Sequence, residues 1–418
     1  MGMNLATALY SIFFLLIPNI VSFEVYALST APRYLALSIL TLFTFLLWLY
    51  YCKAKLVHDV NKYVMFFTSC FFIWALLSTE FSMHMPTALS GGYNVNQGFW
   101  THMMYILIFL MAASLPVDKI ILSRAVVNAM VILAGYAMLQ YFGLDPFDMP
   151  HGGKPVSFIG NSVAMAGAIL LALPFSVYLA ITGKGIGRAY WTFTAYLFLA
   201  TIAASLSRGA MLGVFAIGAV MAIFLFKALR RVIILAVILG IVLMSGIIFN
   251  SKSGANQVQR FNITEMNEDR AASSRLQYWH IAWQIIKDHP FFGVGPDNFK
   301  NAYPLYRTPE LDKTEKNSLN SKAHNGYLQI AATMGIPALI FYLGLMASVI
   351  MVLWRQKGNR LLAMTFLAAL VGYLVQDISG WQELGFTPLM WAILGIGVSG
   401  ENYKPERMNW IFGWTEGQ

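Results

Sequence analysis

The chain has 418 residues, of which 58% are hydrophobic and only 11% are charged, and its mean hydropathy is +0.61. A soluble chain of this length could not bury so much apolar surface in one core, so the composition excludes an ordinary soluble enzyme and indicates a membrane protein. The formal net charge of +9 is typical of a membrane protein whose cytoplasmic loops carry excess Lys and Arg, and we expect no nucleic-acid partner.

Apolar stretches long enough to cross a bilayer follow one another along the chain, and Gly, Pro or charged residues separate most of them. The pattern predicts an all-α, polytopic integral membrane protein with about 12 transmembrane helices. The expected spans are residues 5–23, 33–51, 63–79, 99–115, 121–141, 158–181, 189–206, 209–227, 231–249, 326–354, 360–377 and 385–400.

One polar segment, residues 250–325, is much longer than any other connection between the expected spans. It divides the chain into four predicted parts. The first nine helices occupy residues 1–249, and the polar loop with its amphipathic helices follows. The last three helices occupy residues 326–400, and residues 401–418 form a tail.

Orientation follows from the distribution of Lys and Arg. If the N-terminus is inside, the short inner loops and the tail hold fifteen of these residues, and the short outer connections hold only Arg33, Lys154 and Arg208. This bias predicts that both termini are cytoplasmic and that the 250–325 loop lies outside. In a bacterium with an inner membrane, outside means the periplasm.

Arg208 interrupts a long apolar run, in the stretch ATIAASLSRGAMLGVFAIGAV. The run is long enough for two spans, with Ser207, Arg208 and Gly209 as a tight outer turn. An arginine at membrane depth is costly and usually faces a cavity or a partner, although an interfacial arginine can also extend to lipid headgroups. The small flanking residues would let an anion approach the backbone, which favours a binding role.

The stretch SSRLQYWHIAWQIIKDHP predicts a helix inside the polar segment. Ser274 followed three residues later by Gln277 fits a capping box, which would put Arg275 in the first helical turn, and Pro290 would end the helix. An arginine at a helix N-terminus combines backbone amides with a planar fork that suits phosphate. The alternative is a cationic anchor for lipid headgroups.

The same helix is expected to be amphipathic and to lie on or in the membrane surface. Leu276, Trp279, Trp283 and Ile286 recur at helical spacing, and Arg275 shares the side of Trp279 and Ile286. The turn PFFGVGPDNF follows the helix, and its glycines and prolines indicate a constrained path for the loop rather than a phosphate-binding loop.

His324 and Asn325 lie where the polar segment meets the next span, in SKAHNGYLQIAATMGIP. We expect His324 to open a helix with an apolar face near the membrane surface, with no obvious carboxylate base beside it. An imidazole there has a pKa near the working pH and can accept a proton. The alternative is a capping or packing histidine.

No motif for a metal or a nucleotide is present in the sequence. The chain contains no DxD or HExxH pattern, and Cys52 and Cys70 are its only cysteines. We therefore expect metal-free chemistry without a cofactor, on a substrate that is activated elsewhere.

Four stretches, taken in order, resemble the O-antigen ligase and polymerase superfamily. They are FIGNSVAMAGAILLALP, SRGAMLGVFAIG, SSRLQYWHIAWQIIKDHPFFGVGPDNF and AHNGYLQIAATMGIPALIFYLGL, and together they extend from Gly160 to Gly344. Each motif is modest alone, but the ordered set is fairly specific. One departure is Thr333, because many members of the superfamily have an acidic residue in the helix after the His-Asn pair.

The resemblance implies a GT-C-like, metal-independent, inverting glycosyltransferase that uses an undecaprenyl-pyrophosphate-linked glycan as donor. Carried over to this chain, it implies that Arg208 and Arg275 bind the pyrophosphate, that His324 activates the acceptor hydroxyl, and that Asn325 contacts substrate. The leading interpretation is an O-antigen ligase that transfers the glycan to lipid A–core at the periplasmic face of the inner membrane, among membrane lipids.

Three alternatives stay open at this point. A polymerase or a protein O-oligosaccharyltransferase would use the same donor. Polymerases of the superfamily often carry two arginine-rich outer loops with an Arg-x10-Gly spacing, and the single large loop here lacks that spacing. A transporter is the most distant alternative, because carriers often show paired repeats and charges at the membrane midplane.

Overall fold

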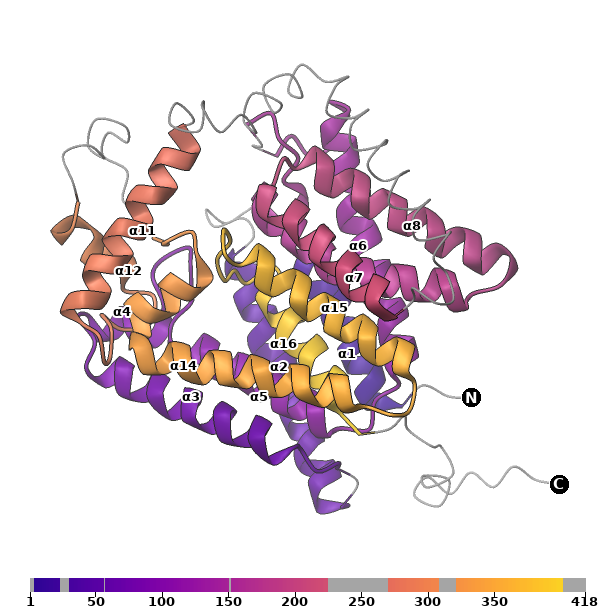
Figure 1. Ribbon diagram of the computed structural model, residues 1–418, viewed down its shortest axis with the longest axis horizontal. Coiled ribbons are helices and arrows are strands. Elements are labelled where there is room, and N and C mark those ends of the chain that lie inside the picture. Colours follow the sequence, from indigo (N-terminus) through magenta and orange to yellow (C-terminus); the bar gives the residue numbers. More distant parts are fainter. Residues whose placement is uncertain are drawn as a thin grey trace.

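The computed structural model describes residues 4–22, 30–55, 57–149, 152–224, 270–307 and 321–400. Within these ranges the chain is built from helices and connections, with no β-strand (Figure 1). The predicted all-α class is therefore confirmed for the part of the chain that is described.

The predicted spans coincide with helices to within a few residues wherever the structure describes them; the expected span 231–249 lies outside the described residues. The helices are α1 (Leu5–Asn19), α2 (Thr30–Lys53), α3 (Lys62–Glu80), α4 (Met85–Ser90), α5 (Phe99–Ser114), α6 (Lys119–Tyr141), η1 (Ser157–Ile159), α7 (Ser162–Thr182), α8 (Gly185–Ala204), Arg208–Phe224, α11 (Arg270–Asp288), α12 (Phe299–Ala302), η2 (Tyr303–Leu305), α14 (Gly326–Arg355), α15 (Arg360–Gln376) and α16 (Thr387–Val398).

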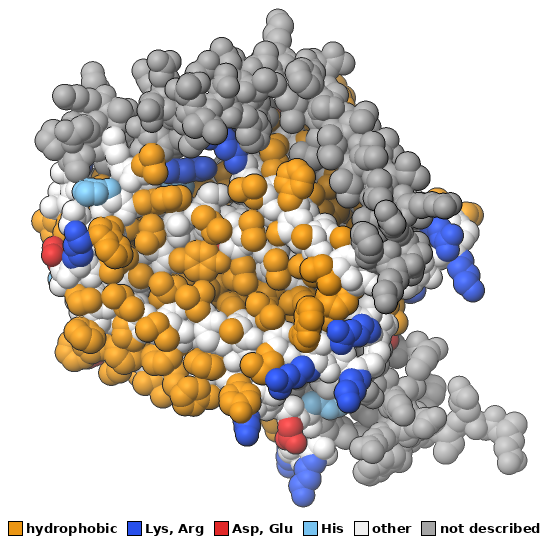
Figure 2. Space-filling model, in the orientation of Figure 1, with side chains coloured by type: hydrophobic (Ala, Val, Ile, Leu, Met, Phe, Trp, Pro, Cys, Tyr) orange, Lys and Arg blue, Asp and Glu red, His pale blue; other side chains and the backbone are white. Residues whose placement is uncertain are grey.

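The described helices include five that are long and apolar enough to cross a membrane, namely α2, α3, α6, α7 and α14. Shorter apolar helices accompany them: α1, α5, α15, α16 and Arg208–Phe224. Figure 2 shows hydrophobic side chains across the middle of one face, with Lys and Arg toward its edges. The chain is a multi-pass membrane protein, and the total of twelve spans stays a prediction.

At one end of the bundle, hydrogen bonds join the starts of some helices to the ends of others. We call it the inner end, after the predicted orientation. Here Asn4 donates to the Pro116 carbonyl before α6, and the His58 N–H before α3 donates to Ser114 at the end of α5. Gln356 after α14 donates to Gly397 near the end of α16. This grouping is the one that helices crossing a single layer in alternating directions would produce.

The other end of the bundle, which we call the outer end, collects the opposite helix termini. Arg33 in the first turn of α2 is 1% exposed and donates to the carbonyls of Ile17 and Pro18 in α1 and of Phe158 in η1. The first N–H of α14, on Gly326, donates to a carbonyl just after α15. Every candidate site residue named from the sequence lies at this end.

The core between the two ends is packed through aromatic and small residues. α16 packs along α5, and α14 along α3. Trp391 of α16 is 1% exposed, and its ring stacks on Phe71 of α3 and on Tyr105 of α5. Gly395 lies against the Phe109 carbonyl and leaves no room for a β-carbon, so a small residue permits the close approach of α16 and α5.

A break in α14 receives the glycine-rich turn that follows α11. Gly335 has a φ of 88°, which interrupts the helix. The N–H groups of Val294 and Gly295 donate to carbonyls of α14 at 3.1 and 2.8 Å, and the Ile336 N–H donates back to Pro290 at 2.8 Å. These bonds satisfy backbone groups that the break would leave without partners, and they agree with the interpretation of this turn as architecture.

The expected N-terminal cap of α11 is wrong, whereas its placement on or in the membrane surface stays a prediction. The helix begins at Arg270, so Ser274 lies inside it and is not the N-terminal cap, and Arg275 is in the second turn. Leu276 and Trp283 are 58% and 52% exposed. The buried side instead contains Tyr278, Ile281, Ala282, Ile285 and Ile286, because α11 packs on α14.

Candidate functional site

The His324 side chain is held between α11 and the connection from α15 to α16. Its ring stacks on Tyr278 with 5.4 Å between centroids and meets the edge of Trp381 at 4.6 Å. The Trp279 indole N–H donates to the His324 carbonyl at 3.4 Å. The imidazole is half-buried, so it is fixed in place while part of it stays accessible.

Asn325, and not His324, caps α14. Its Oδ1 accepts hydrogen bonds from the N–H groups of Tyr327 and Leu328, both at 3.0 Å, and the residue is 8% exposed. The helix begins one residue later, at Gly326, so the expectation that His324 opens the helix is wrong. The alternative that His324 caps the helix is excluded as well, because Asn325 is the cap. A contact between Asn325 and substrate stays a prediction.

The connection between α15 and α16, residues 377–386, places a carboxyl group next to the His324 segment. The Gly326 N–H donates to the Asp377 carbonyl at 2.9 Å, and a β-carbon on Gly326 would overlap the Asp377 carboxylate. Asp377 is fully buried, and burial raises its pKa to about 7. Asp377 thus lies beside Gly326, two residues after His324 in the chain, and the expectation that no carboxylate base lies beside His324 stays untested.

The residue after Arg208 packs against the same connection from another helix. Arg208 is the first residue of the helix Arg208–Phe224, directly after a turn in which Leu206 has a φ of 57°. A β-carbon on the next residue, Gly209, would overlap the Ser379 hydroxyl and lie 3.1 Å from the Gln376 carbonyl. A tight turn is thus present, but residues 205–207 form it, and Arg208 and Gly209 begin the helix that packs on the 377–386 connection.

Arg275 is linked to the same place through α11. It lies one helical turn before Tyr278 and Trp279, the two residues of α11 that contact His324. The structure therefore brings Arg208, Arg275 and His324 to one region of the outer end, around residues 377–386. We call this region the outer polar site.

A second carboxyl group of the connection also belongs to the outer polar site. Burial raises the pKa of Glu383 to about 7, and the positive charges of Arg33 and Lys322 oppose that rise. Glu383 therefore lies within electrostatic reach of two cations that come from α2 and from the segment before His324. The site has both signs of charge, as a charged donor and a proton transfer would require.

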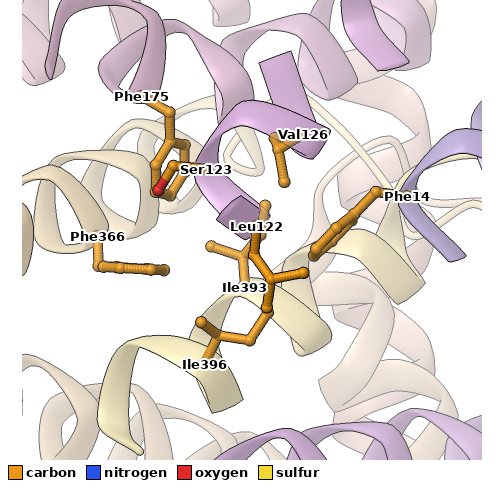
Figure 3. A pocket seen from close by; sticks show the side chains of 8 residues that line it. All are labelled: Phe14, Leu122, Ser123, Val126, Phe175, Phe366, Ile393 and Ile396. Atoms are coloured by element: carbon orange, nitrogen blue, oxygen red, sulfur yellow. The ribbon is translucent and has the colours of Figure 1, made fainter. Parts of the chain in front are cut away.

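The apolar crevice in Figure 3 is not part of this site. Its empty volume is about 160 Å³, with no space that a water molecule could occupy. Leu122 and Ser123 line it, close to Lys119 at the inner end, together with Phe14, Val126, Phe175, Phe366, Ile393 and Ile396. We attribute it to imperfect packing of helices. Among the described residues, no group of three His, Cys, Asp or Glu side chains could hold a metal ion.

Comparison with known proteins locates the family resemblance in the chain. Residues 193–343 match the family model described as O-Antigen ligase. The resemblance to that family is confirmed over these residues. They include Arg208, Arg275 and His324, so the three predicted residues lie inside the segment that matches the family model.

A curated relative matches a similar share of the chain. The teichuronic acid biosynthesis protein TuaE of Bacillus subtilis (strain 168) is 27% identical over 208 residues. The match includes 47% of this chain and 40% of the relative, so the chain covers less than half of that relative's length.

Asp377, Trp381 and Glu383 were missed by the reasoning from sequence. They lie after the end of the family match at residue 343, and the count of Lys and Arg that gives the orientation ignores acidic residues. A usable signal was nevertheless present. Asp377 ends the apolar stretch 360–377, and Trp381 and Glu383 follow within a few residues, on the side predicted to face out.

Proposed function

We propose that this protein is an O-antigen ligase. It transfers a glycan from undecaprenyl pyrophosphate to lipid A–core oligosaccharide at the periplasmic face of the inner membrane, without a metal and with inversion at the anomeric carbon. Two observations support the proposal: the helix that Arg208 begins and the His324 ring both pack on residues 377–386, with Arg275 one turn before Tyr278, and residues 193–343 match the O-antigen ligase family model.

In this proposal the two arginines bind the pyrophosphate of the donor. Arg208 begins a helix and Arg275 lies in the second turn of α11, so both are fixed to regular structure. When the anomeric C–O bond breaks, negative charge grows on the leaving pyrophosphate. Guanidinium groups in a partly dry site stabilise that charge and can contact it with two parallel hydrogen bonds.

His324 takes the proton from the attacking hydroxyl. The acceptor oxygen forms a bond to the anomeric carbon on the face opposite the pyrophosphate, the leaving group departs with its electron pair, and the proton passes to the neutral imidazole. General base catalysis of this kind contributes about 10²- to 10⁴-fold. The contacts with Tyr278 and Trp381 fix the plane of the ring, which favours transfer in one direction.

Asp377 is, besides Glu383, a further group in the site that could accept a proton. Its pKa of about 7 places it between the ionised and neutral forms at the working pH. It lies beside Gly326, two residues from His324 in the chain. A comparison of His324→Gln with Asp377→Asn therefore decides which of the two is the base.

The outer position of the site is part of the proposal. A cysteine introduced at exposed Lys300, in a chain with Cys52 and Cys70 changed to Ser, should react with a membrane-impermeant maleimide when only the outer membrane is permeabilised. Labelling that requires lysis of the inner membrane would reverse the orientation.

A glycan polymerase is the second candidate. The printed name of the Bacillus subtilis relative refers to teichuronic acid biosynthesis and not to lipopolysaccharide, so the acceptor is the part of the proposal most in need of a test. The donor site and the base would be the same, and only the molecule that presents the hydroxyl would differ.

Purified protein with lipid-linked donor separates these functions. A ligase joins the glycan to lipid A–core, whereas a polymerase lengthens the glycan on its lipid carrier. We expect the core-linked product. Lengthened glycan on the lipid carrier would show that the protein is a polymerase and not a ligase. Absence of any transfer would contradict both proposed functions.

A further inference from the structure

A buried ion pair lies just before the His324 segment. Lys322 Nζ is 3.0 Å from Asp297 Oδ1, and the side chains are 8% and 1% exposed. Two charges withdrawn from water this far depend strongly on each other, since removal of one partner leaves the other charge buried and uncompensated. The pair therefore fixes the position of Lys322 relative to the turn that follows α11.

Asp297 is itself held by a third segment. Its other carboxylate oxygen, Oδ2, accepts hydrogen bonds from the N–H groups of Gly92 at 2.7 Å and Gln97 at 3.1 Å. These residues belong to the connection between α4 and α5. The carboxylate thus joins this connection, the turn after α11 and the segment before α14, and it gives Lys322 an anchor fixed by backbone groups.

Hydrogen bonds and ring contacts fix the residues from Lys322 to Asn325. The Ala323 N–H donates to Oε1 of Gln329 at 2.7 Å, and Asn325 caps α14. Between them, His324 has a φ of 53°. Non-glycine residues adopt this left-handed region rarely, and they keep it only where the surroundings impose it.

The pair also relates His324 to the helix that carries Arg275. Asp297 lies in the turn that continues from α11, and that turn is hydrogen-bonded into the break of α14. Lys322 ties the start of the His324 segment to the same turn. Loss of the Lys322–Asp297 ion pair would therefore move the imidazole relative to Arg275, while both the His324 and the Arg275 side chains stay present.

We propose that Lys322, held by Asp297, is a positioning residue that fixes the backbone presenting His324 to the outer polar site. This inference rests on the proposed function for its effect on turnover, but the placement of His324 can be measured without it. Displacement of a catalytic group by about 1 Å can lower the rate by about 10²-fold, so a modest movement is enough to be seen.

The test compares two buried lysines. Lys322→Gln and Asp297→Asn should lower kcat by about 10- to 100-fold per folded molecule and leave the KM for the donor within about threefold of wild type. Lys119→Met is the matched control, because Lys119 is 6% exposed and Lys322 is 7% exposed, but Lys119 lies at the inner end. It should leave both constants unchanged.

A second readout needs no catalysis. In protein with ¹³C-labelled histidine, which has seven imidazole signals, the His324 signal is assigned by its loss in His324→Gln. It should shift in Lys322→Gln and in Asp297→Asn and stay in place in Lys119→Met. An unmoved His324 signal in folded Lys322→Gln, or an equal shift in Lys119→Met, would overturn the positioning role. If wild-type protein shows no transfer activity, the proposed function is contradicted. The imidazole signal then still tests whether Lys322 positions His324.

Discussion

Two lysines of nearly equal burial lie at opposite ends of the bundle and have different kinds of hydrogen-bond partner. Lys119, at the inner end, donates to the carbonyls of Gly397 and Ser399 at 3.2 and 2.9 Å. A cation near the C-terminus of a helix, here α16, suits the helix dipole. Lys322, at the outer end, meets the Asp297 carboxylate, which also accepts two backbone N–H groups. The inner lysine closes a helix, whereas the outer lysine connects three segments around His324.

The inner and outer ends also differ in their buried carboxyl groups. Asp377 and Glu383 both lie at the outer end, and burial raises the pKa of each to about 7. Groups with strongly shifted pKa values gather at functional sites more often than elsewhere. The inner end instead adjoins the apolar crevice of Figure 3. The difference indicates that the outer end retains groups that favour chemistry at some expense of stability.

The largest effect is expected from the arginines. Arg208→Ala and Arg275→Ala should each lower transfer by at least about 10²- to 10³-fold while the protein still accumulates, because charge on the leaving pyrophosphate loses its partner. Lys at either position should restore little, since a point charge replaces a planar fork. Arg188→Ala, at an exposed position predicted to lie inside, is the control and should transfer normally. Near-normal lipopolysaccharide laddering in either site variant would reduce that arginine to a headgroup anchor.

Asp377→Asn should change the pH dependence of stability. The pKa of Asp377 is raised in the folded state, so its contribution to the free energy of unfolding is full at low pH and is lost as the pH rises through about 7. A shift of about three pH units corresponds to roughly 4 kcal/mol as an upper bound. The melting temperature of the variant relative to wild type should therefore be higher at pH 8 than at pH 5. An equal difference at both values would mean that Asp377 is ionised throughout.

Lys119→Met tests the inner side of the comparison. It removes the hydrogen bonds to Gly397 and Ser399 and should lower the free energy of unfolding by about 1–3 kcal/mol. Transfer per folded molecule should not change. Loss of transfer in folded Lys119→Met would show that the two ends are coupled.

The smallest effect is expected from metal removal. Transfer by the purified enzyme should be the same with and without EDTA, because the two arginines supply the positive charge for the pyrophosphate. Activity that falls in chelator and returns with Mg²⁺ or Mn²⁺ would reveal a carboxylate-bound metal.

The sequence was sufficient to predict the described helices and to nominate three candidate residues, whose roles stay predictions. Spans follow from local hydropathy, which requires no knowledge of distant contacts. Arg208 stands out because it interrupts a long apolar run, whereas Arg275 and His324 lie in the polar segment and stand out by the motifs around them. Local patterns could therefore find them without a structure.

The buried side of α11 and the role of the 377–386 connection could not be predicted in the same way. Apolar residues lie on several sides of α11, and periodicity cannot say whether α14 or lipid covers Trp283 or Ile285. Asp377 contacts Gly326 only because the end of α15 lies beside the start of α14. Such contacts depend on packing between segments far apart in the chain.

The proposal that His324 is the base at the outer polar site is tested most directly by donor binding and turnover in one purified variant, His324→Gln. The amide keeps a hydrogen-bonding side chain but cannot take the proton. We expect donor binding close to wild type, because Arg208 and Arg275 are intact, and turnover lower by about 10²- to 10⁴-fold. Wild-type turnover in His324→Gln would contradict this role and leave His324 as a residue that only orients the acceptor.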